Sequence, residues 1–223
     1  AGLELNNKGG AVAAFESPLH IEACVFRENY AFIQGGAVFS TAYPWPGAPR
    51  VDEAQVPADL VIIGCTFVDN WSGDEGGAVA TSDTQARIVD SVFLGNRAVM
   101  GGALGFLNGS HQVLRCRFEK NRARLAGGAV IYTGQEDLYL EEVEFRENEA
   151  EDRGGAVGMR SGNLLSLLRC WFLDNRAIRG GAVEVYRARM EADYVLWYRQ
   201  SASDRGGGLF VEESPGVALS HCS

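Results

Sequence analysis

The chain has 223 residues and a formal net charge of −9, with 46% hydrophobic and 22% charged residues. This composition is that of a folded chain with a sizeable core, and the acidic balance argues against nucleic acid or an anionic membrane as a partner. No apolar run approaches the ~20 residues of a membrane-spanning helix, so no transmembrane segment is expected in this chain.

Sixteen of the 28 glycines form eight doublets at nearly constant spacing. The doublets begin at Gly9, Gly35, Gly76, Gly101, Gly127, Gly154, Gly180 and Gly206, with separations of 26, 41, 25, 26, 27, 26 and 26 residues. A small residue and then an aliphatic one follow each doublet, as in Ala11-Val12. Such a period predicts a repeat architecture.

Three further residue types recur in fixed order before most doublets. Phe and Asn occur three residues apart, in the pairs Phe26 and Asn29, Phe67 and Asn70, Phe93 and Asn96, Phe118 and Asn121, Phe145 and Asn148, and Phe172 and Asn175. The seventh copy is predicted at Tyr198 and Ser201. The position two residues before the Phe holds Cys24, Cys65, Ser91, Cys116, Val143, Cys170 and then Leu196, and Cys222 falls at the same offset in an eighth repeat.

The apolar positions of one repeat predict short strands rather than a helix. Ile21, Ile62 and Ile88 stand five residues before the Phe, on the opposite parity from the Cys column, so the chain must bend between them. The repeat therefore predicts three short strands separated by bends, and stacked repeats share a continuous core. We expect an all-β, right-handed, three-sided parallel β-helix of seven to eight coils, with residues 1–223 as one domain.

Each repeated position has a structural interpretation, because a catalytic residue is needed once and a corner residue in every coil. Glycine doublets allow positive φ and close approach of neighbouring coils. Asn tolerates the left-handed conformation, and stacked Asn amides can form a hydrogen-bonded ladder. Stacked Phe rings and the Cys column are expected to fill the interior.

The paired motifs F-x-x-N and GGA[VLI], repeated over about Cys24 to Phe210, resemble the repeat of the chlamydial polymorphic outer membrane proteins. Similar repeats occur in large surface proteins of other bacteria, protists and algae. The resemblance implies a β-helix displayed outside the cell or on its surface, acting as an adhesin, a surface coat or a filament component.

One repeat carries an insertion of about 15 residues, 42–56, which is rich in proline and aromatic residues. A stiff Tyr-Pro-Trp-Pro-Gly run suits a protrusion that loses little entropy on docking, so Tyr43 and Trp45 are candidate partner-binding residues. The alternative is a tolerated surface insertion, or a flap that covers the flank of its own coil.

Partner chains are expected to contact the solenoid at its ends or along its side. Neither end carries a recognisable polar cap, so residues 1–223 are interpreted as a segment of a longer solenoid, or one that stacks end-on against other chains. The strand after each doublet avoids charge on both faces, which predicts either a flat lateral packing stripe or small residues required only by the glycine corner.

No catalytic residue, cofactor or metal site is predicted. His20, His111 and His221 are scattered, and the acidic spots at Asp74 with Glu75 and at Glu149, Glu151 and Asp152 favour solvated charge over a surface Ca²⁺ site.

Cysteine pairing and glycosylation leave alternatives open. Most cysteines lie two rungs apart, beyond the reach of a disulfide, and are expected to be buried free thiols; Cys24 and Cys65, in adjacent coils, could be bridged. Asn108, in a predicted turn, and Asn70, within the ladder, fit the N-glycosylation pattern.

Two functions follow from these residues. The first is a non-enzymatic extracellular or cell-surface protein that assembles with other chains or adheres to them, or to host or surface glycans. The second is an extracellular polysaccharide lyase or hydrolase built on the same fold, favoured if carboxylates and Arg gather in one groove beside the 42–56 insertion.

Overall fold

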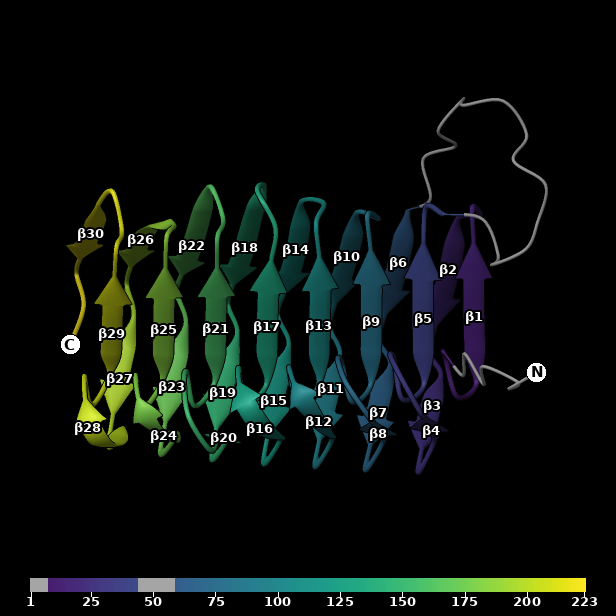
Figure 1. Ribbon diagram of the computed structural model, residues 1–223, viewed down its shortest axis with the longest axis horizontal. Coiled ribbons are helices and arrows are strands. Elements are labelled where there is room, and N and C mark those ends of the chain that lie inside the picture. The colour runs from purple at the N-terminus through teal and green to yellow at the C-terminus, as the bar shows by residue number, and fades with distance from the viewer. Residues whose placement is uncertain (1–7, 44–58) are drawn as a thin grey trace, which may run out of the picture.

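The computed structural model describes residues 8–43 and 59–223 as a solenoid of parallel β-strands (Figure 1). The described ranges contain no helix, and hence none long and apolar enough to cross a membrane. The strands form four sheets, here numbered I to IV in the order in which the chain enters them.

Sheets I and II have eight strands each. Sheet I follows the glycine doublets and contains β1 (Val12–Phe15), β5 (Val38–Thr41), β9 (Val79–Ser82), β13 (Leu104–Leu107), β17 (Val130–Thr133), β21 (Val157–Arg160), β25 (Val183–Tyr186) and β29 (Leu209–Glu212). Sheet II contains β2 (Leu19–Glu22), β6 (Leu60–Ile63), β10 (Ala86–Val89), β14 (His111–Leu114), β18 (Asp137–Glu141), β22 (Leu164–Leu168), β26 (Arg189–Asp193) and β30 (Val217–Ser220).

Sheets III and IV have seven shorter strands each. Sheet III contains β3 (Val25–Arg27), β7 (Thr66–Val68), β11 (Val92–Leu94), β15 (Arg117–Glu119), β19 (Glu144–Arg146), β23 (Trp171–Leu173) and β27 (Leu196–Tyr198). Sheet IV contains β4 (Tyr30–Ala31), β8 (Trp71–Ser72), β12 (Arg97–Met100), β16 (Arg122–Ala126), β20 (Glu149–Ala150), β24 (Arg176–Arg179) and β28 (Ser201–Arg205).

The predicted parallel β-helix is confirmed, with one more strand in each coil than the sequence suggested. The three predicted strands are those of sheets I, II and III, and the strand of sheet IV follows the Asn position. Every strand pairs in parallel with its equivalent in the next coil, as when Phe93 aligns with Phe118.

Bends with positive φ separate the four strands of a coil. The first glycine of each doublet has φ between 59° and 67°, as predicted. The expectation that Asn itself is left-handed is wrong: the residue before it has the positive φ, as at Asp69 (52°) and Lys120 (56°). Asn serves instead as an inward-pointing hydrogen-bonding residue, and we call this bend between sheets III and IV the Asn corner.

The second glycine of the doublet allows the coils to approach one another. A Cβ atom at Gly102 would lie 2.2 Å from the carbonyl oxygen of Gly128 in the next coil, and at Gly36 the corresponding distance is 1.9 Å. No side chain fits at such a separation, so only glycine satisfies the stacking distance.

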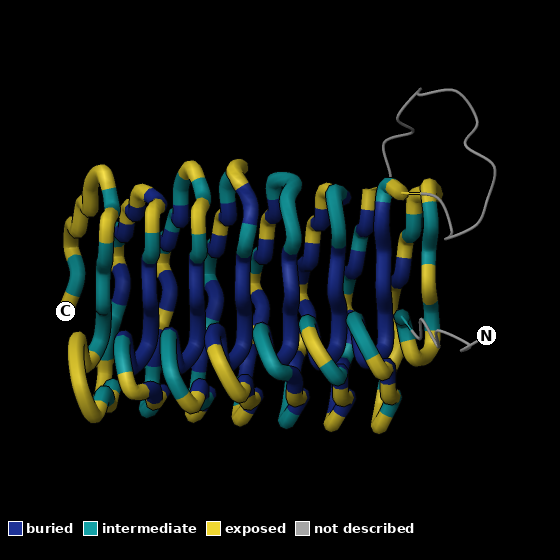
Figure 2. The backbone as a smooth tube through the Cα atoms, viewed as in Figure 1, coloured by how far each residue is buried: buried dark blue, intermediate teal, exposed yellow. Residues whose placement is uncertain are grey.

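The interior consists of columns that run from coil to coil. The Phe rings stack with centroid separations of 4.7–5.1 Å from Phe26 to Trp197, and each Asn amide donates to the next Asn across 2.9–3.0 Å. Burial of each such ring is worth roughly 2–3 kcal/mol. Figure 2 shows the strands of sheet I buried along most of their length between β5 and β25.

Three residues of the seventh repeat differ from those predicted. Trp197 and Gln200 occupy the seventh Phe and Asn positions rather than Tyr198 and Ser201, since Trp197 stacks on Phe172 and Gln200 accepts from Asn175. In the Cys column, the buried Val195 replaces the predicted Leu196.

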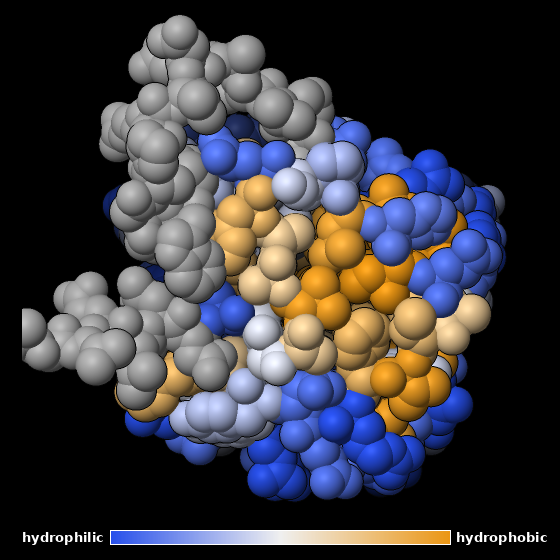
Figure 3. Space-filling view, turned by 90° about the vertical axis from the view of Figure 1, so that its right-hand side faces the viewer, coloured by the Kyte–Doolittle hydropathy of each residue, from blue (hydrophilic) through white to orange (hydrophobic). Residues whose placement is uncertain are grey.

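An end view places the apolar side chains centrally. Figure 3 looks at the β1 end of the solenoid, where hydrophobic residues lie in the middle and hydrophilic residues surround them. The coil is thus a closed ring of strands whose outward residues are available for function and whose inward residues are committed to packing.

Candidate functional site

The outward side of the Asn corner carries two parallel columns of exposed or half-exposed residues. Because Asn points inward, its two neighbours in the chain point outward. The residues before Asn are Glu28, Asp69, Gly95, Lys120, Glu147, Asp174 and Arg199, and the residues after it are Tyr30, Trp71, Arg97, Arg122, Glu149, Arg176 and Ser201. We call them the first and second corner columns.

The space between these columns is an open groove of about 700 Å³. Its lining residues come from successive coils and are mostly charged: Asp69, Leu94, Gly95, Arg97, Lys120, Arg122, Glu147, Asn148, Glu149, Asp174, Arg176, Arg199 and Ser201. The groove therefore follows the solenoid axis.

Ion pairs neutralise the part of the groove nearest the C-terminal coils. Glu149 contacts Arg122 at 3.7 Å and Arg176 at 2.5 Å, and its side chain is only 28% exposed. Arg199 lies 3.1 Å from Asp174. These pairs join consecutive coils, so their most direct role is to stabilise stacking.

The opposite part of the groove has a different character. Asp69 and Arg97 are exposed and form no ion pair or side-chain hydrogen bond within the described residues. Gly95 leaves a gap in the first column, into which the Asp69 carboxylate leans: Asp69 Oδ1 lies 2.4 Å from where a Cβ would stand. Next to Arg97 in the second column, Trp71 stacks on Tyr30 with a centroid separation of 4.5 Å.

The 42–56 insertion joins β5 to β6 in the sequence. The described ends of these two strands lie at the edge of the solenoid between sheets I and II, whereas the Asn corner occupies the other edge (Figure 1). Tyr43 is exposed at the end of a described range. Trp45 and the rest of residues 44–56 lie outside the described residues, so the predicted docking role of Tyr43 and Trp45 stays a prediction.

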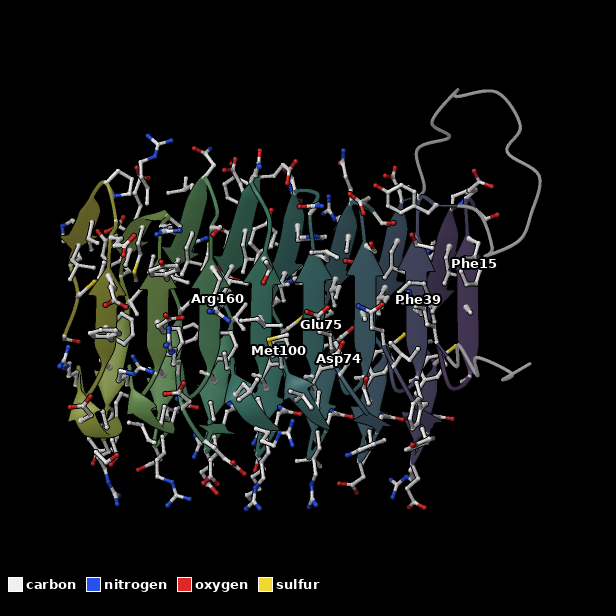
Figure 4. The ribbon with its side chains drawn as sticks, in the orientation of Figure 1. Phe15, Phe39, Asp74, Glu75, Met100 and Arg160 are labelled. Carbon is white, nitrogen blue, oxygen red and sulfur yellow. The ribbon has the colours of Figure 1, made fainter. Side chains whose placement is uncertain are left out.

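Each acidic spot has at least one carboxylate that contacts another protein side chain. Figure 4 shows Asp74 and Glu75 beside Met100 on the side of sheet I. Gln34 donates to Glu75 at 3.0 Å, and burial raises the pKa of Glu75.

At the second spot, Asp152 receives a hydrogen bond from Arg179 at 2.8 Å. Burial alone would raise the pKa of Asp152, but contact with arginine outweighs this effect, so the pKa is lowered. Within residues 8–43 and 59–223, no three His, Cys, Asp or Glu residues are placed to hold a metal ion.

The lateral stripe predicted on the strands after the doublets is mostly covered. Its central outward column is buried from Phe39 to Glu184, with Phe39 and Ile131 at 1% exposure and Glu184 at 0%, whereas Ala13 in the first coil is exposed and Phe210 in the last is half-buried. Residues before the doublet of the preceding coil cover them, as when Lys8 lies 4.6 Å from the Phe39 ring centre and Arg153 lies 3.7 Å from Glu184. From β5 to β25, this outward column is therefore covered by the chain itself and offers no lateral packing surface.

The cysteines are all free thiols, including the adjacent Cys24 and Cys65. Cys65, Cys116 and Cys170 are buried as expected, whereas Cys24 is exposed and Cys222 is half-buried. The first coil leaves Cys24 uncovered because the column has no earlier member among the described residues.

The two candidate glycosylation residues differ in accessibility. Asn108 is half-buried in a turn, and its amide donates to Asp83 at 3.0 Å. Asn70 is fully buried, and its amide donates to Phe26 and Asn96 within the ladder. A glycan has no room at Asn70 in the folded chain.

The histidines remain separate. His20 lies near Glu22, and His221 contacts Asp193 at 2.8 Å on the surface. His111 is buried against Phe106, with ring centroids 4.0 Å apart, and accepts a hydrogen bond from the Ala86 amide. Burial lowers the pKa of His111 to about 4, so the ring is a neutral core residue at physiological pH.

Fold and surface together define a parallel β-helix repeat protein with an open, charged groove along one corner. No protein-family model matches the chain, and no solved structure matches it. It is similar to metabotropic glutamate receptor-like protein R of Dictyostelium discoideum, with 25% identity over 186 residues that cover 82% of this chain and 11% of that protein. Metabotropic glutamate receptor-like protein P of the same organism is 25% identical over 188 residues, covering 79% of this chain and 13% of that protein.

Proposed function

We propose that this chain is a non-enzymatic β-helix displayed outside the cell or at the cell surface, where it adheres to a partner or assembles with other chains. The receptor-like names of the two relatives support a surface location. The resemblance of the repeat to chlamydial polymorphic outer membrane proteins supports adhesion or filament assembly as the mode of action.

The observation that carries this proposal is the pairing of charges from coil to coil. Around the coil, Arg115 pairs with Asp90, Arg179 with Asp152 and Arg187 with Glu213, each within 2.9 Å. Such pairs link neighbouring coils and engage these carboxylates with guanidinium groups. A rigid rod that presents its outer surface is what this arrangement supports best.

Polysaccharide cleavage is the second candidate, because the groove of the Asn corner contains both carboxylates and arginines. Glycoside hydrolysis needs two carboxylates free to act on one bond. In the groove, Glu149 and Asp174 are held by arginines and Glu147 lies 3.8 Å from Lys120, which leaves Asp69 alone. The geometry therefore favours binding over cleavage.

An adhesion and turnover experiment tests the proposal. The purified chain is attached to fluorescent beads, and bead retention on cells and on polysaccharide-coated surfaces is measured beside sedimentation velocity of the free chain. We expect retention or concentration-dependent assembly, with no release of reducing ends or unsaturated sugars. Release of such products that disappears in Asp69→Asn or Glu149→Gln would establish the enzymatic alternative instead.

A further inference from the structure

The groove has one end at which an aromatic pair adjoins unpaired polar groups. We call this the aromatic end and define it by Tyr30, Asp69, Trp71, Gly95 and Arg97. Tyr30 is 50% exposed and lies on β4, the edge strand of sheet IV. Trp71 is 39% exposed and lies on β8, which pairs with β4 on one side and β12 on the other. The two rings together give the charged groove an adjoining apolar surface.

The aromatic end carries one acid, Asp69, and one base, Arg97, and neither forms an ion pair within the described residues. Arg97 aligns directly with Arg122 in the next coil, and like charges in register repel each other. Arg122 has an ion-pair partner in Glu149, one coil further along, at 3.7 Å. Among the described residues, Arg97 forms no ion pair. A carboxylate from outside, placed between the two guanidinium groups, would relieve this repulsion and gain charge-assisted hydrogen bonds.

We propose that the aromatic end binds an acidic polysaccharide, with a uronate carboxylate held by Arg97 and Arg122. The Asp69 carboxylate, which is exposed beside Gly95, accepts hydrogen bonds from sugar hydroxyl groups. The C–H face of a sugar ring packs on the exposed flank of Trp71 and Tyr30. This inference rests on the proposed binding function and names its ligand class and its site.

The shape of the site favours a sugar chain over a folded protein. A stable protein interface needs a closely packed apolar centre within at least about 1,000 Å² of buried surface. The groove instead is open, is lined mostly by charged residues and follows the axis across several coils, and the Trp71–Tyr30 pair adjoins it beside Arg97. A linear polymer that alternates apolar ring faces with carboxylates fits this surface along its length.

Calorimetric titration of the whole chain with defined tetrasaccharides tests the inference. The probes are the tetramers of galacturonate, of guluronate and of glucuronate with N-acetylglucosamine, and the fully methyl-esterified galacturonate tetramer keeps the rings but loses the charge. We expect at least one acidic tetramer to bind, and its methyl ester to bind about tenfold more weakly, since a charge-assisted hydrogen bond is worth ~1.5–3 kcal/mol.

Matched variants locate the site. Trp71→Ala and Arg97→Gln should each weaken binding about tenfold. Trp171→Ala and Arg87→Gln should leave it unchanged, because Trp171 has a similar exposure of 41% on sheet III, and Arg87 is exposed on sheet II with no ion pair to any residue that the structure describes. Thermal melting of all four variants separates loss of binding from loss of folding.

Several outcomes would overturn the inference. These are no binding of any acidic tetramer, equal binding of acid and ester, equal binding of tetraglutamate as an acidic peptide, or equal effects of the site and control variants. Bead retention or self-assembly of the wild-type chain without uronate binding would refute this inference alone. Absence of retention and of assembly together would refute the proposed function.

Discussion

At the residue scale, the second glycine of every doublet except the last is constrained by the neighbouring coil. In Gly102→Ala the new Cβ would meet the Gly128 carbonyl oxygen at 2.2 Å and the Arg122 backbone at 2.7 Å, both of which are parts of hydrogen-bonded strands or corners. Because neither can move without separating the coils, we expect a loss of at least about 2 kcal/mol in the free energy of unfolding. Urea denaturation followed by circular dichroism measures it.

Gly216→Ala provides the matched control for this substitution. A Cβ at Gly216 meets nothing within 4 Å, and the residue is not in the left-handed region. Its effect should stay within about 0.5 kcal/mol. Equal losses in the two variants would show that coil contact is not the cause.

His111 makes stability depend on pH. Burial lowers its pKa in the folded chain to about 4, from the ordinary value of 6.5. Above pH 6.5 the ring is neutral in both states and the shift has no effect. As the pH falls further, the unfolded chain takes up a proton that the folded chain cannot, so the free energy of unfolding decreases by about 3 kcal/mol in total by pH 4.

Comparison with His111→Leu isolates this contribution. Leu occupies the aligned position in other coils, at Leu60, Leu138 and Leu165, so the column accepts it. Burial raises the pKa of Glu75 and of Glu184, whose contributions to stability have the opposite pH dependence and cancel between the two proteins. Parallel curves of unfolding free energy for wild type and variant between pH 7 and pH 4 would contradict the assignment.

Thiol reactivity should follow burial along the Cys column. Burial raises the pKa of the Cys116 and Cys170 thiols to about 12, so the folded chain holds little thiolate at either residue at pH 8. Cys24 is exposed. Iodoacetamide should therefore modify Cys24 first, and Cys116 and Cys170 only on unfolding, as followed by peptide mass spectrometry; similar rates at the three thiols in the native chain would refute this ordering.

At the scale of the element, the Asn ladder ties the coils together. Asn121 Oδ1 accepts from the backbone amide and side chain of Asn96, and its own amide donates to Phe93 and Asn148. Asn121→Asp removes both donated bonds and places a charge where the side chain is fully buried. Each buried group left without a partner costs about 1–3 kcal/mol, so we expect a loss of ~3 kcal/mol or more in a thermal or urea melt.

Asn29→Asp is the corresponding change at the end of the ladder. Asn29 donates to Asn70 but accepts from no earlier Asn within the described residues, and it is half-buried. A charge there remains partly solvated, so the loss should be clearly smaller than at Asn121. Equal losses at both positions would mean that the ladder does not act through burial.

The inward-facing columns of the coil can be predicted from the sequence, because each inward residue packs against its equivalent in the next coil and keeps the same residue type. Phe and Asn recur because each must match the same residue in the next coil, and the period follows directly. The strand of sheet IV was missed because the left-handed residue at the Asn corner varies freely, from Asp69 to Gly95 to Lys120, since its side chain points outward. The seventh copy was misplaced for a related reason: Gln200 continues the ladder with a different amide residue.

The groove could not be predicted because it arises from differences between coils. The corner columns have no fixed chemistry, so no repeat pattern marks them. What creates the aromatic end is the absence of a side chain at Gly95 and, within the described residues, the lack of an ion-pair partner for Arg97. Only the register between coils brings these residues next to Trp71.

At the scale of the whole molecule, the solenoid is a one-dimensional stack in which each coil contacts only its neighbours, so stability should be nearly a sum over coils and their interfaces. Deletion of residues 122–148 removes one complete period, since Asn121 and Asn148 are 27 residues apart in equivalent positions. Asn121 is then followed by Glu149, and Phe118 can stack directly on Phe172, as Phe118 now does on Phe145. We expect a folded, monodisperse chain with an unchanged β-sheet circular dichroism spectrum, expressed as mean residue ellipticity, and a lower melting temperature.

Deletion of 122–134, roughly half a period, leaves the columns out of register and should abolish cooperative unfolding. If both deletions had the same effect, the coils would not be the independent units that their ladders indicate.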